Sequence, residues 1–445
     1  TSACIIGAGI AGLKAASDLE KAQIPYIIVE GSSRIGGRVY PVKFEDGYLQ
    51  LGATYINGDK NPIYSIAKSN GLIDLNATYE GDDYVPLHTD REVIQGRDLR
   101  EFTEFVDGLE EKFYKFAVDG GEKELLTIAF EKEYQDFLKT GNHSSRRARF
   151  DSLARMYLTD LETEWAAIMA NFALGNYARF DDGSEERTEF SLDKNGFKKI
   201  LDVISANIPQ NKFKFNSVVT NIDYSSGSSV KLDTSTGSIN CQAVIVTCSL
   251  GYLKKHSSTL FTPPLPQKKT TAINALGFGN NGKLFLVYDR PWLEKVQYRT
   301  MALSTPSIFG RGLTFDVTPW SKKTVQFWFS GPAVEEIGAM SDEKLMREIT
   351  AHLISTLKNM TVPYPQRVFR HMWSSDPLVL GSYSWLTPSA VALGDANQIL
   401  AEPIKGDNRR PLVLFAGEAT HSSIYQTTIG AYLSGQREAK RLTAK

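Results

Sequence analysis

A glycine-rich stretch near the N-terminus is the first candidate for chemistry. The residues Gly7, Ala8, Gly9, Ile10, Ala11 and Gly12 follow the apolar run ACII and precede a helical pattern, LKAASDLEKA. In such a loop the first glycine permits a tight turn, the second lets a pyrophosphate approach the backbone, and the third lets the helix pack closely on a sheet. A second apolar run ends at Glu30, 23 residues after Gly7, where a carboxylate can bind both hydroxyls of a ribose. The order of these features predicts a dinucleotide site.

Two more segments could hold the same ligand. The stretch GSSRIGGRV follows Glu30, and its paired glycines before Arg38 permit close passage of the backbone and supply a cation for a phosphate. A β-turn with a solvated arginine is the alternative interpretation. Near the other end, the apolar run LVLFAGEATH closes on Gly417 and Glu418 and is followed by a helical pattern. A strand, an acid and a helix so far from the first loop suggest a cofactor domain assembled from both ends of the chain.

Composition excludes several classes of protein. The chain has 445 residues, 42% of them hydrophobic and 23% charged, with Lys+Arg 50 against Asp+Glu 51. A soluble chain of this length normally forms two or three domains, and its charge balance gives nucleic acid no overall attraction. No run approaches the ~18 apolar residues of a membrane span. The three cysteines, Cys4, Cys241 and Cys248, have no metal-binding or redox spacing, so we expect no metal, unpaired thiols and a reducing compartment.

Taken together, these motifs resemble those of the FAD-dependent amine oxidases. The likeness extends through LGATYINGDKNPIY, VIVTCSLGYLKK, GSYSW and the terminal GEATH and GAYLSGQREA segments, and it is greatest to polyamine oxidases of the spermine oxidase and N1-acetylpolyamine oxidase kind. It implies an α/β fold. A discontinuous, Rossmann-like FAD domain of the glutathione-reductase type would comprise residues 1–75, 195–270 and 400–445. An α+β substrate domain with a mixed sheet flanked by helices would comprise 76–194 and 271–400.

The resemblance also implies which residues hold FAD. Attachment would be noncovalent, because monoamine oxidases carry cysteine where this chain has Ser382. Besides the loop from Gly7 to Gly12, the implied cofactor-binding residues are Glu30, Gly31, Ser32, Arg34, Gly37, Arg38, Leu51, Gly52, Ala53, Thr54, Val218, Thr247, Trp373, Gly417, Glu418, Thr427, Thr428 and Ala431.

Four residues are the implied catalytic set: Lys283, Tyr383, Tyr425 and Asn57. By position alone, Lys283 would be a solvated residue at the start of a strand, but the family places a lysine here, linked through water to flavin N5. The two tyrosines would stand before the flavin face and orient the substrate. Asn57 departs from the family, which has histidine or glutamate at this position; asparagine forms hydrogen bonds but does not titrate.

Substrate contacts are expected from the same region and from acidic loops, since polyamines are polycations. The run FDDGSEERTEF supplies Asp181, Asp182, Glu185, Glu186 and Glu189, although a solvated turn would have the same composition. The expected substrate-binding residues are Tyr55, Asn57, Asp59, Asp182, Glu186, Tyr383 and Tyr425.

The function implied is oxidation of a secondary amine of spermine, spermidine or an N1-acetylpolyamine. Hydride would pass to flavin N5 and oxygen would reoxidise the flavin, giving an aminoaldehyde, a shorter amine and hydrogen peroxide. The alternatives are another amine substrate, of the monoamine or methyl-lysine type, and a catalytically silent FAD-binding scaffold. We expect a monomer or weak homodimer in the cytoplasm or peroxisome, without a nucleic-acid or membrane partner. The sequence leaves open which polyamine is preferred and which C–N bond is cleaved.

Overall fold

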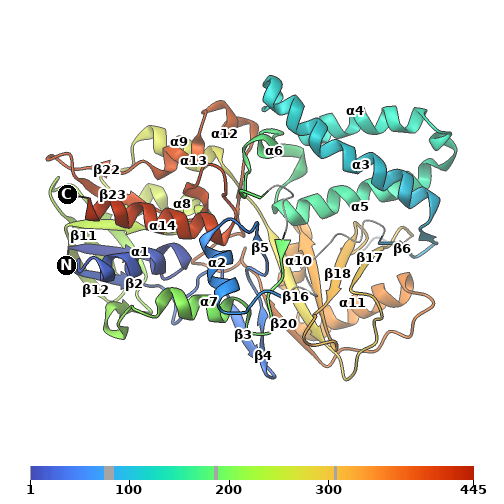
Figure 1. Ribbon diagram of the computed structural model, residues 1–445, viewed down its shortest axis with the longest axis horizontal. Coiled ribbons are helices and arrows are strands. Elements are labelled where there is room, and N and C mark those ends of the chain that lie inside the picture. The colour runs from blue at the N-terminus through green and yellow to red at the C-terminus, as the bar shows by residue number, and fades with distance from the viewer. Residues whose placement is uncertain (1, 75–84, 185–188, 305–307, 445) are drawn as a thin grey trace.

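Two large sheets lie side by side along the long axis of the molecule in the computed structural model, which describes residues 2–74, 85–184, 189–304 and 308–444 (Figure 1). Both termini of the chain lie beside the first sheet. The second lies at the opposite end, between two groups of helices. Their strands come from the segments expected for the FAD domain and the substrate domain respectively, and the exact domain boundaries stay a prediction.

The first sheet is six-stranded, and its central strands run parallel. The strands β1 and β13 are buried along their whole length, as expected for parallel strands covered on both faces. Helices α1, α7 and α14 cover one face, against side chains such as Ile5 and Ile28. In spatial order the strands are β22 (Ile404–Lys405), β23 (Pro411–Phe415), β13 (Ala243–Val246), β1 (Ala3–Ile6), β2 (Tyr26–Val29) and β9 (Phe213–Lys214), and the helices are α1 (Ile10–Lys21), α7 (Gly196–Ser205) and α14 (Thr428–Thr443).

A four-stranded sheet covers the other face of the first sheet, where Cys4 and Ile6 pack with Ile222 and Leu232. Its strands are β12 (Gly237–Cys241), β11 (Val230–Thr234), β10 (Val219–Asp223) and β14 (Phe261–Thr262).

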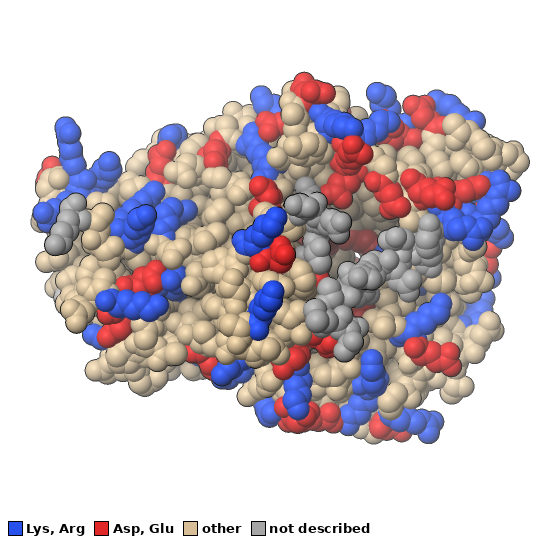
Figure 2. All heavy atoms as spheres, in the orientation of Figure 1, with Lys and Arg blue, Asp and Glu red and all other residues tan. Residues whose placement is uncertain are grey.

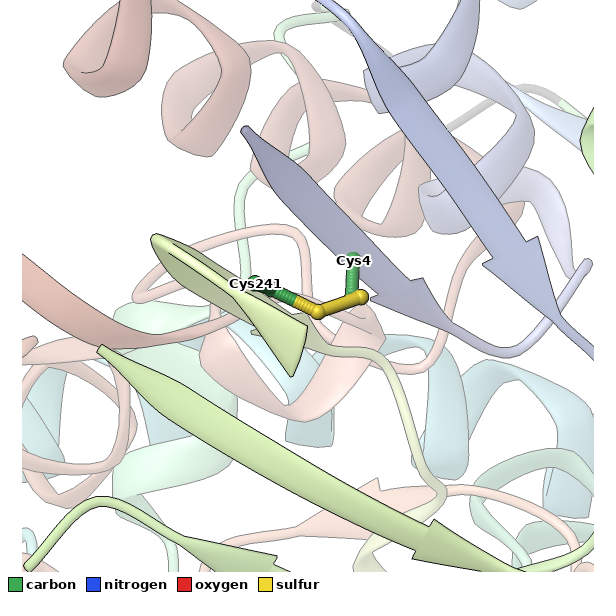
Figure 3. The surroundings of a disulfide bond; sticks show 2 residues. All are labelled: Cys4 and Cys241. Atoms are coloured by element: carbon green, nitrogen blue, oxygen red, sulfur yellow. A yellow bond between two sulfur atoms is a disulfide. The ribbon is translucent and has the colours of Figure 1, made fainter. Parts of the chain in front are cut away.

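A disulfide joins these two sheets, from Cys4 in β1 to Cys241 at the end of β12 (Figure 3). The expectation of three unpaired cysteines is therefore wrong. Sequence spacing could not reveal the pair, because 237 residues separate the two cysteines and only the packing of sheet on sheet brings their Cα atoms to 5.9 Å. Cys248 is the free cysteine.

The second sheet is mixed and seven-stranded. Leu284, Leu286 and Phe327 point from one face into a core shared with α10 and α11, while Phe285 and Val287 point the other way. In order the strands are β20 (Arg367–His371), β16 (Asn281–Val287), β19 (Thr324–Ser330), β18 (Leu313–Val317), β17 (Gln297–Met301), β6 (Leu87–Thr89) and β7 (Val93–Ile94), and the two helices are α10 (Pro332–Ala339) and α11 (Asp342–Thr356).

A group of helices, α3 to α6, projects above this sheet (Figure 1). The ion pair between Asp160 of α5 and Arg299 of β17, 3.2 Å from Oδ2 to Nε, helps to hold α5 on the sheet. The helices are α3 (Arg97–Phe116), α4 (Leu126–Lys139), α5 (Arg147–Trp165) and α6 (Gly175–Arg179).

The remaining elements connect the two halves. The helices are α2 (Pro62–Ser69), α8 (Leu250–Leu260), α9 (Gln267–Ala275), α12 (Pro388–Ala392) and α13 (Ala396–Ala401). The strand pairs are β3 (Pro41–Phe44) with β4 (Gly47–Gln50), β5 (Ile56–Asn57) with β8 (Glu189–Phe190), and β15 (Gly277–Phe278) with β21 (Ser384–Trp385). Short 3₁₀ and π segments span Ala117–Gly121, His143–Arg146, Met169–Asn171, Gln210–Lys212 and Glu418–Thr420. Among the described helices, none combines the length and the apolar composition that crossing a bilayer requires.

Candidate functional site

A cavity of about 380 Å³ runs from the carboxyl ends of β1, β2 and β23 to the face of the seven-stranded sheet. Its volume falls in the range of small-molecule sites, and the edge where parallel strands end is where α/β sheets bind ligands. All the expected cofactor residues line it except Ala8 and Gly12. Gly12 lies against the turn instead, since a Cβ there would meet the oxygen of Gly7 at 2.0 Å.

At one end of the cavity, Glu30 fixes the glycine loop. Its Oε2 accepts a hydrogen bond from the backbone N–H of Ala8 at 2.6 Å, and its Oε1 accepts from the N–H and the hydroxyl of Ser32, each at 2.7 Å. Beside it, Gly9 leaves open space: a Cβ there would meet only the oxygen of Gly36, at 3.9 Å. An open backbone at a helix N-terminus suits a phosphate, so this end fits the diphosphate and ribose of a dinucleotide.

Arg38 and Glu418 join the two ends of the chain across the cavity. Arg38 Nη1 lies 2.9 Å from Glu418 Oε1 and donates to the carbonyl of Ser382 at 2.7 Å. Glu418 also accepts from the Ser384 hydroxyl at 2.7 Å and from the Gln426 N–H at 2.9 Å. Arg38 is therefore a paired, mostly enclosed side chain, and the solvated arginine considered from the sequence is not what the structure contains.

Lys283 lies in the wall of the cavity that the seven-stranded sheet supplies. It is 4% exposed, and its Nζ donates to the carbonyl of Gly52 at 2.7 Å and to the hydroxyl of Thr54. Trp328 is its partner on β19, and the ammonium lies 4.8 Å from the centre of that ring. Burial lowers the pKa of Lys283 well below its usual value, and nearby Asp316 only partly opposes this. A buried amine with a lowered pKa is suited to handling a proton at neutral pH.

Aromatic rings form the adjoining walls. Tyr55 stacks on Trp328 with 6.3 Å between ring centres. The hydroxyl of Tyr383 accepts a hydrogen bond from Asn281 Nδ2 at 2.9 Å and donates to the carbonyl of Glu164 at 2.9 Å. These bonds hold the Tyr383 ring in place at the cavity, where a flat apolar surface can contact an alkyl chain.

Asn57 also lines the cavity, and its Nδ2 donates to Glu189 Oε1 at 2.9 Å. Three other expected substrate residues, Asp59, Asp182 and Tyr425, do not line the cavity. Asp59 is exposed, and Asp182 is buried in a turn where it accepts from the N–H and the hydroxyl of Ser184. Tyr425 is fully buried and donates to Asn176 Oδ1 at 3.0 Å. Glu186 lies outside the described residues.

Several cavity residues were not among the candidates singled out from the sequence. Asn281 could have been found, because it precedes Lys283 by two positions on one strand and so shares its face. Trp328 and Glu164 carry no such signal, since only strand pairing and helix packing bring them to the cavity. The additional lining residues include Glu164, Trp165, Phe180, Tyr252, Asn281, Trp328, Asp376 and Gln426.

This geometry defines a dinucleotide-binding protein whose cofactor site opens into a pocket with a buried lysine and aromatic walls. A family model for flavin-containing amine oxidoreductases matches residues 10–443. The chain therefore belongs to the flavin-containing amine oxidoreductase family, and its cofactor is FAD. The open backbone at Gly9 and the guanidinium of Arg38 suit the phosphates of such a cofactor, and the Glu30 carboxylate is an acceptor of the kind that binds a ribose hydroxyl. The fold, the enzyme class and the cofactor expected from the sequence are thus confirmed.

The relatives include amine oxidases of more than one kind. The peroxisomal N(1)-acetyl-spermine/spermidine oxidase of Bos taurus is 28% identical, over 98% of this chain and 94% of that protein. A probable polyamine oxidase 5 of Arabidopsis thaliana is also 28% identical, over 98% and 97%. The lysine-specific histone demethylase 2 of Homo sapiens is 32% identical, over 100% of this chain and 53% of that protein. A redesigned putrescine oxidase structure shares the fold, with a TM-score of 0.71 and 16% identity, over 100% of this chain and 99% of that one.

Proposed function

We propose that this enzyme oxidises a secondary amine of a polyamine, namely spermine, spermidine or an N1-acetylated derivative. The observation that carries the proposal is the lining of the pocket around Lys283. Aromatic side chains and the carboxylate of Glu189 line the same cavity. A polyamine needs both, because its methylene segments are apolar and its nitrogens are cationic. The curated relatives named as polyamine oxidases support this choice.

FAD, when bound, supplies the two-electron acceptor for oxidation of the carbon beside the amine nitrogen. The protein supplies position and protonation state. Because burial lowers its pKa, Lys283 loses its proton more readily than a solvated lysine, and its neutral form can hold water through the lone pair. Tyr55 and Tyr383 restrict how the alkyl chain enters. The products would be an aminoaldehyde, a shorter amine and, with oxygen as the final acceptor, hydrogen peroxide.

We further propose that FAD is held without a covalent bond. The cysteine that lines the cavity is Cys248, and burial raises the pKa of its thiol to about 12, so it is not a nucleophilic thiolate at neutral pH. Ser382 exchanges hydrogen bonds with the backbone of Asn281 through its hydroxyl. Release of free FAD on acid denaturation would support this; flavin that stays with the precipitated protein would contradict it.

The main alternative is a methyl-lysine substrate, which the 32% identity to a histone demethylase favours. The two functions separate in one experiment. Anaerobic bleaching of the flavin is followed with spermine, spermidine, their N1-acetyl forms, a monoamine and a methyl-lysine peptide in parallel, and peroxide is measured in air. The proposal is supported if a polyamine gives the highest ratio of the flavin-reduction rate constant to Kd among these amines. Bleaching by the monoamine or the peptide alone would refute it, and no bleaching by any amine would favour the silent scaffold.

Location in the cytoplasm or peroxisome stays a prediction. So does the oligomeric state, a monomer or a weak homodimer. The Cys4–Cys241 disulfide is unusual for a reducing compartment. Cys4 is 0% and Cys241 3% exposed, so a reductant reaches the bond only when the protein opens.

A further inference from the structure

The pairing of β5 with β8 places Asn57 directly opposite Glu189. Opposite residues of an antiparallel pair point to the same face of the sheet, and here the two side chains meet in an amide-to-carboxylate hydrogen bond of 2.9 Å. Both line the cavity that contains Lys283. The asparagine that departs from the family is therefore one half of a pair, and its partner is an acid.

Glu189 is an exposed residue on the wall of the cavity, so its carboxylate is accessible to a ligand there. No described cation forms an ion pair with Glu189. A ligand that brings a positive charge into the cavity would therefore form the ion pair that Glu189 lacks.

The position of Glu189 relative to Lys283 suits a substrate with two nitrogens. Lys283 binds the hydroxyl of Thr54, and Asn57 follows three residues later in the same segment, a path of at most about 10 Å. Tyr55 lies between Thr54 and Asn57 in the sequence and stacks on Trp328. Burial raises the pKa of Tyr55, and the negative charge of Glu189 contributes to the rise. An alkyl chain lying along these rings would have one end near Lys283 and the other near the carboxylate.

The surface around the cavity has a compatible charge. Figure 2 shows acidic side chains gathered beside a hollow in the right half of the molecule, below the helices α3 to α5. Glu164 of α5 lines the cavity as well. A negative entrance raises the local concentration of a polycation, but it does not distinguish one nitrogen of the substrate from another. That distinction requires a contact inside the cavity.

We propose that Glu189, oriented by Asn57, binds a second, cationic nitrogen of the substrate and thereby selects polyamines over monoamines. Glu189 is the specificity-determining residue and Asn57 a positioning residue that acts through it. The inference rests on the proposed function, because it concerns the same site.

The test uses the FAD-loaded enzyme and its Glu189→Gln variant, with flavin absorbance as the check on folding. Anaerobic flavin reduction is measured with the best polyamine and with a dialkyl monoamine of matched length that has methylene groups in place of the terminal nitrogens. Losing the carboxylate that pairs with a charge of the substrate should raise the Kd for the polyamine about 10-fold. The Kd for the monoamine should stay within about threefold. Asn57→Ala should also raise the Kd for the polyamine, by a smaller factor than Glu189→Gln.

Asp181→Asn is the matched control, because it neutralises an exposed acid of the same run that does not line the cavity. It should leave the ratio of polyamine to monoamine Kd unchanged. The inference is overturned if Glu189→Gln weakens both substrates equally or neither, or if Asp181→Asn produces the selective loss. If the wild-type flavin were reduced by the monoamine and by no polyamine, the proposed function itself would fall, which the wild-type data alone reveal.

Discussion

Removing the Cys4–Cys241 disulfide should lower the thermal stability of the protein by several degrees. The bond closes a loop with a sequence separation of 237 residues, which in the chain-entropy model removes about 18 cal/mol/K from the unfolded state, or about 5.5 kcal/mol at 25 °C. For a chain of 445 residues the entropy of unfolding is about 0.9 kcal/mol/K. The ratio gives a fall in Tm of about 6 °C if the chain unfolds in one transition.

Two measurements test this reasoning. Alkylation of the unfolded, unreduced protein followed by mass spectrometry should label one cysteine, Cys248, in the wild type and none in Cys248→Ala. The double variant Cys4→Ala/Cys241→Ala should melt about 6 °C lower than the wild type in calorimetry. Three labelled cysteines in the wild type would show that the bond does not form. A double variant that melts within about 1 °C of the wild type would refute the entropic argument.

Three further predictions concern the cofactor and Lys283. Gly9→Ala should fold with an unchanged far-UV spectrum, because its Cβ meets no protein atom closer than 3.9 Å, but it should lose most of its FAD; full flavin content would contradict a phosphate beside Gly9. Lys283→Met should keep FAD and slow either flavin reduction or reoxidation at least about 100-fold in stopped-flow measurements; unchanged turnover would exclude Lys283 from the reaction. Lys283 should also make stability depend on pH. The pKa of Lys283 in the folded protein lies well below its usual value of 10.5. Between these two pKa values, Lys283 is protonated in the unfolded chain but not in the folded protein, so the free energy of unfolding rises with pH. The urea-unfolding free energy of the wild-type apoprotein, relative to Lys283→Met, should therefore increase as the pH rises toward about 10. Curves that stay parallel in this range would refute the burial argument.

Much of the cofactor half could be predicted because its determinants are local. Gly7, Gly9 and Gly12 have fixed tasks at fixed spacing, and Glu30 ends the next strand, so one βαβ unit specifies the loop and its ribose acid. The role of Arg38 was harder to predict, because a pair of glycines before an arginine is also typical of a turn with a solvated arginine. Its pairing with Glu418 joins residues 380 positions apart, and no local pattern encodes that contact.

The substrate half was less predictable. Sequence resemblance indicated Lys283, but its burial and lowered pKa depend on the pairing of β16 with β19 and on the segment from Gly52 to Thr54. The acidic run before Phe190 offered five candidates of similar appearance. Of these, Glu189 reaches the cavity because it opens β8, while Asp182 is used in its own turn.

The sequence by itself therefore determined the family, the cofactor and the residues that meet within short segments, because turn geometry and strand periodicity act over a few residues. Only the tertiary structure decided which acid faces the substrate pocket, which aromatic rings line it and which cysteines pair. Those outcomes depend on contacts between distant strands and helices, whose free energy comes from packing the whole chain and leaves no pattern in any one segment.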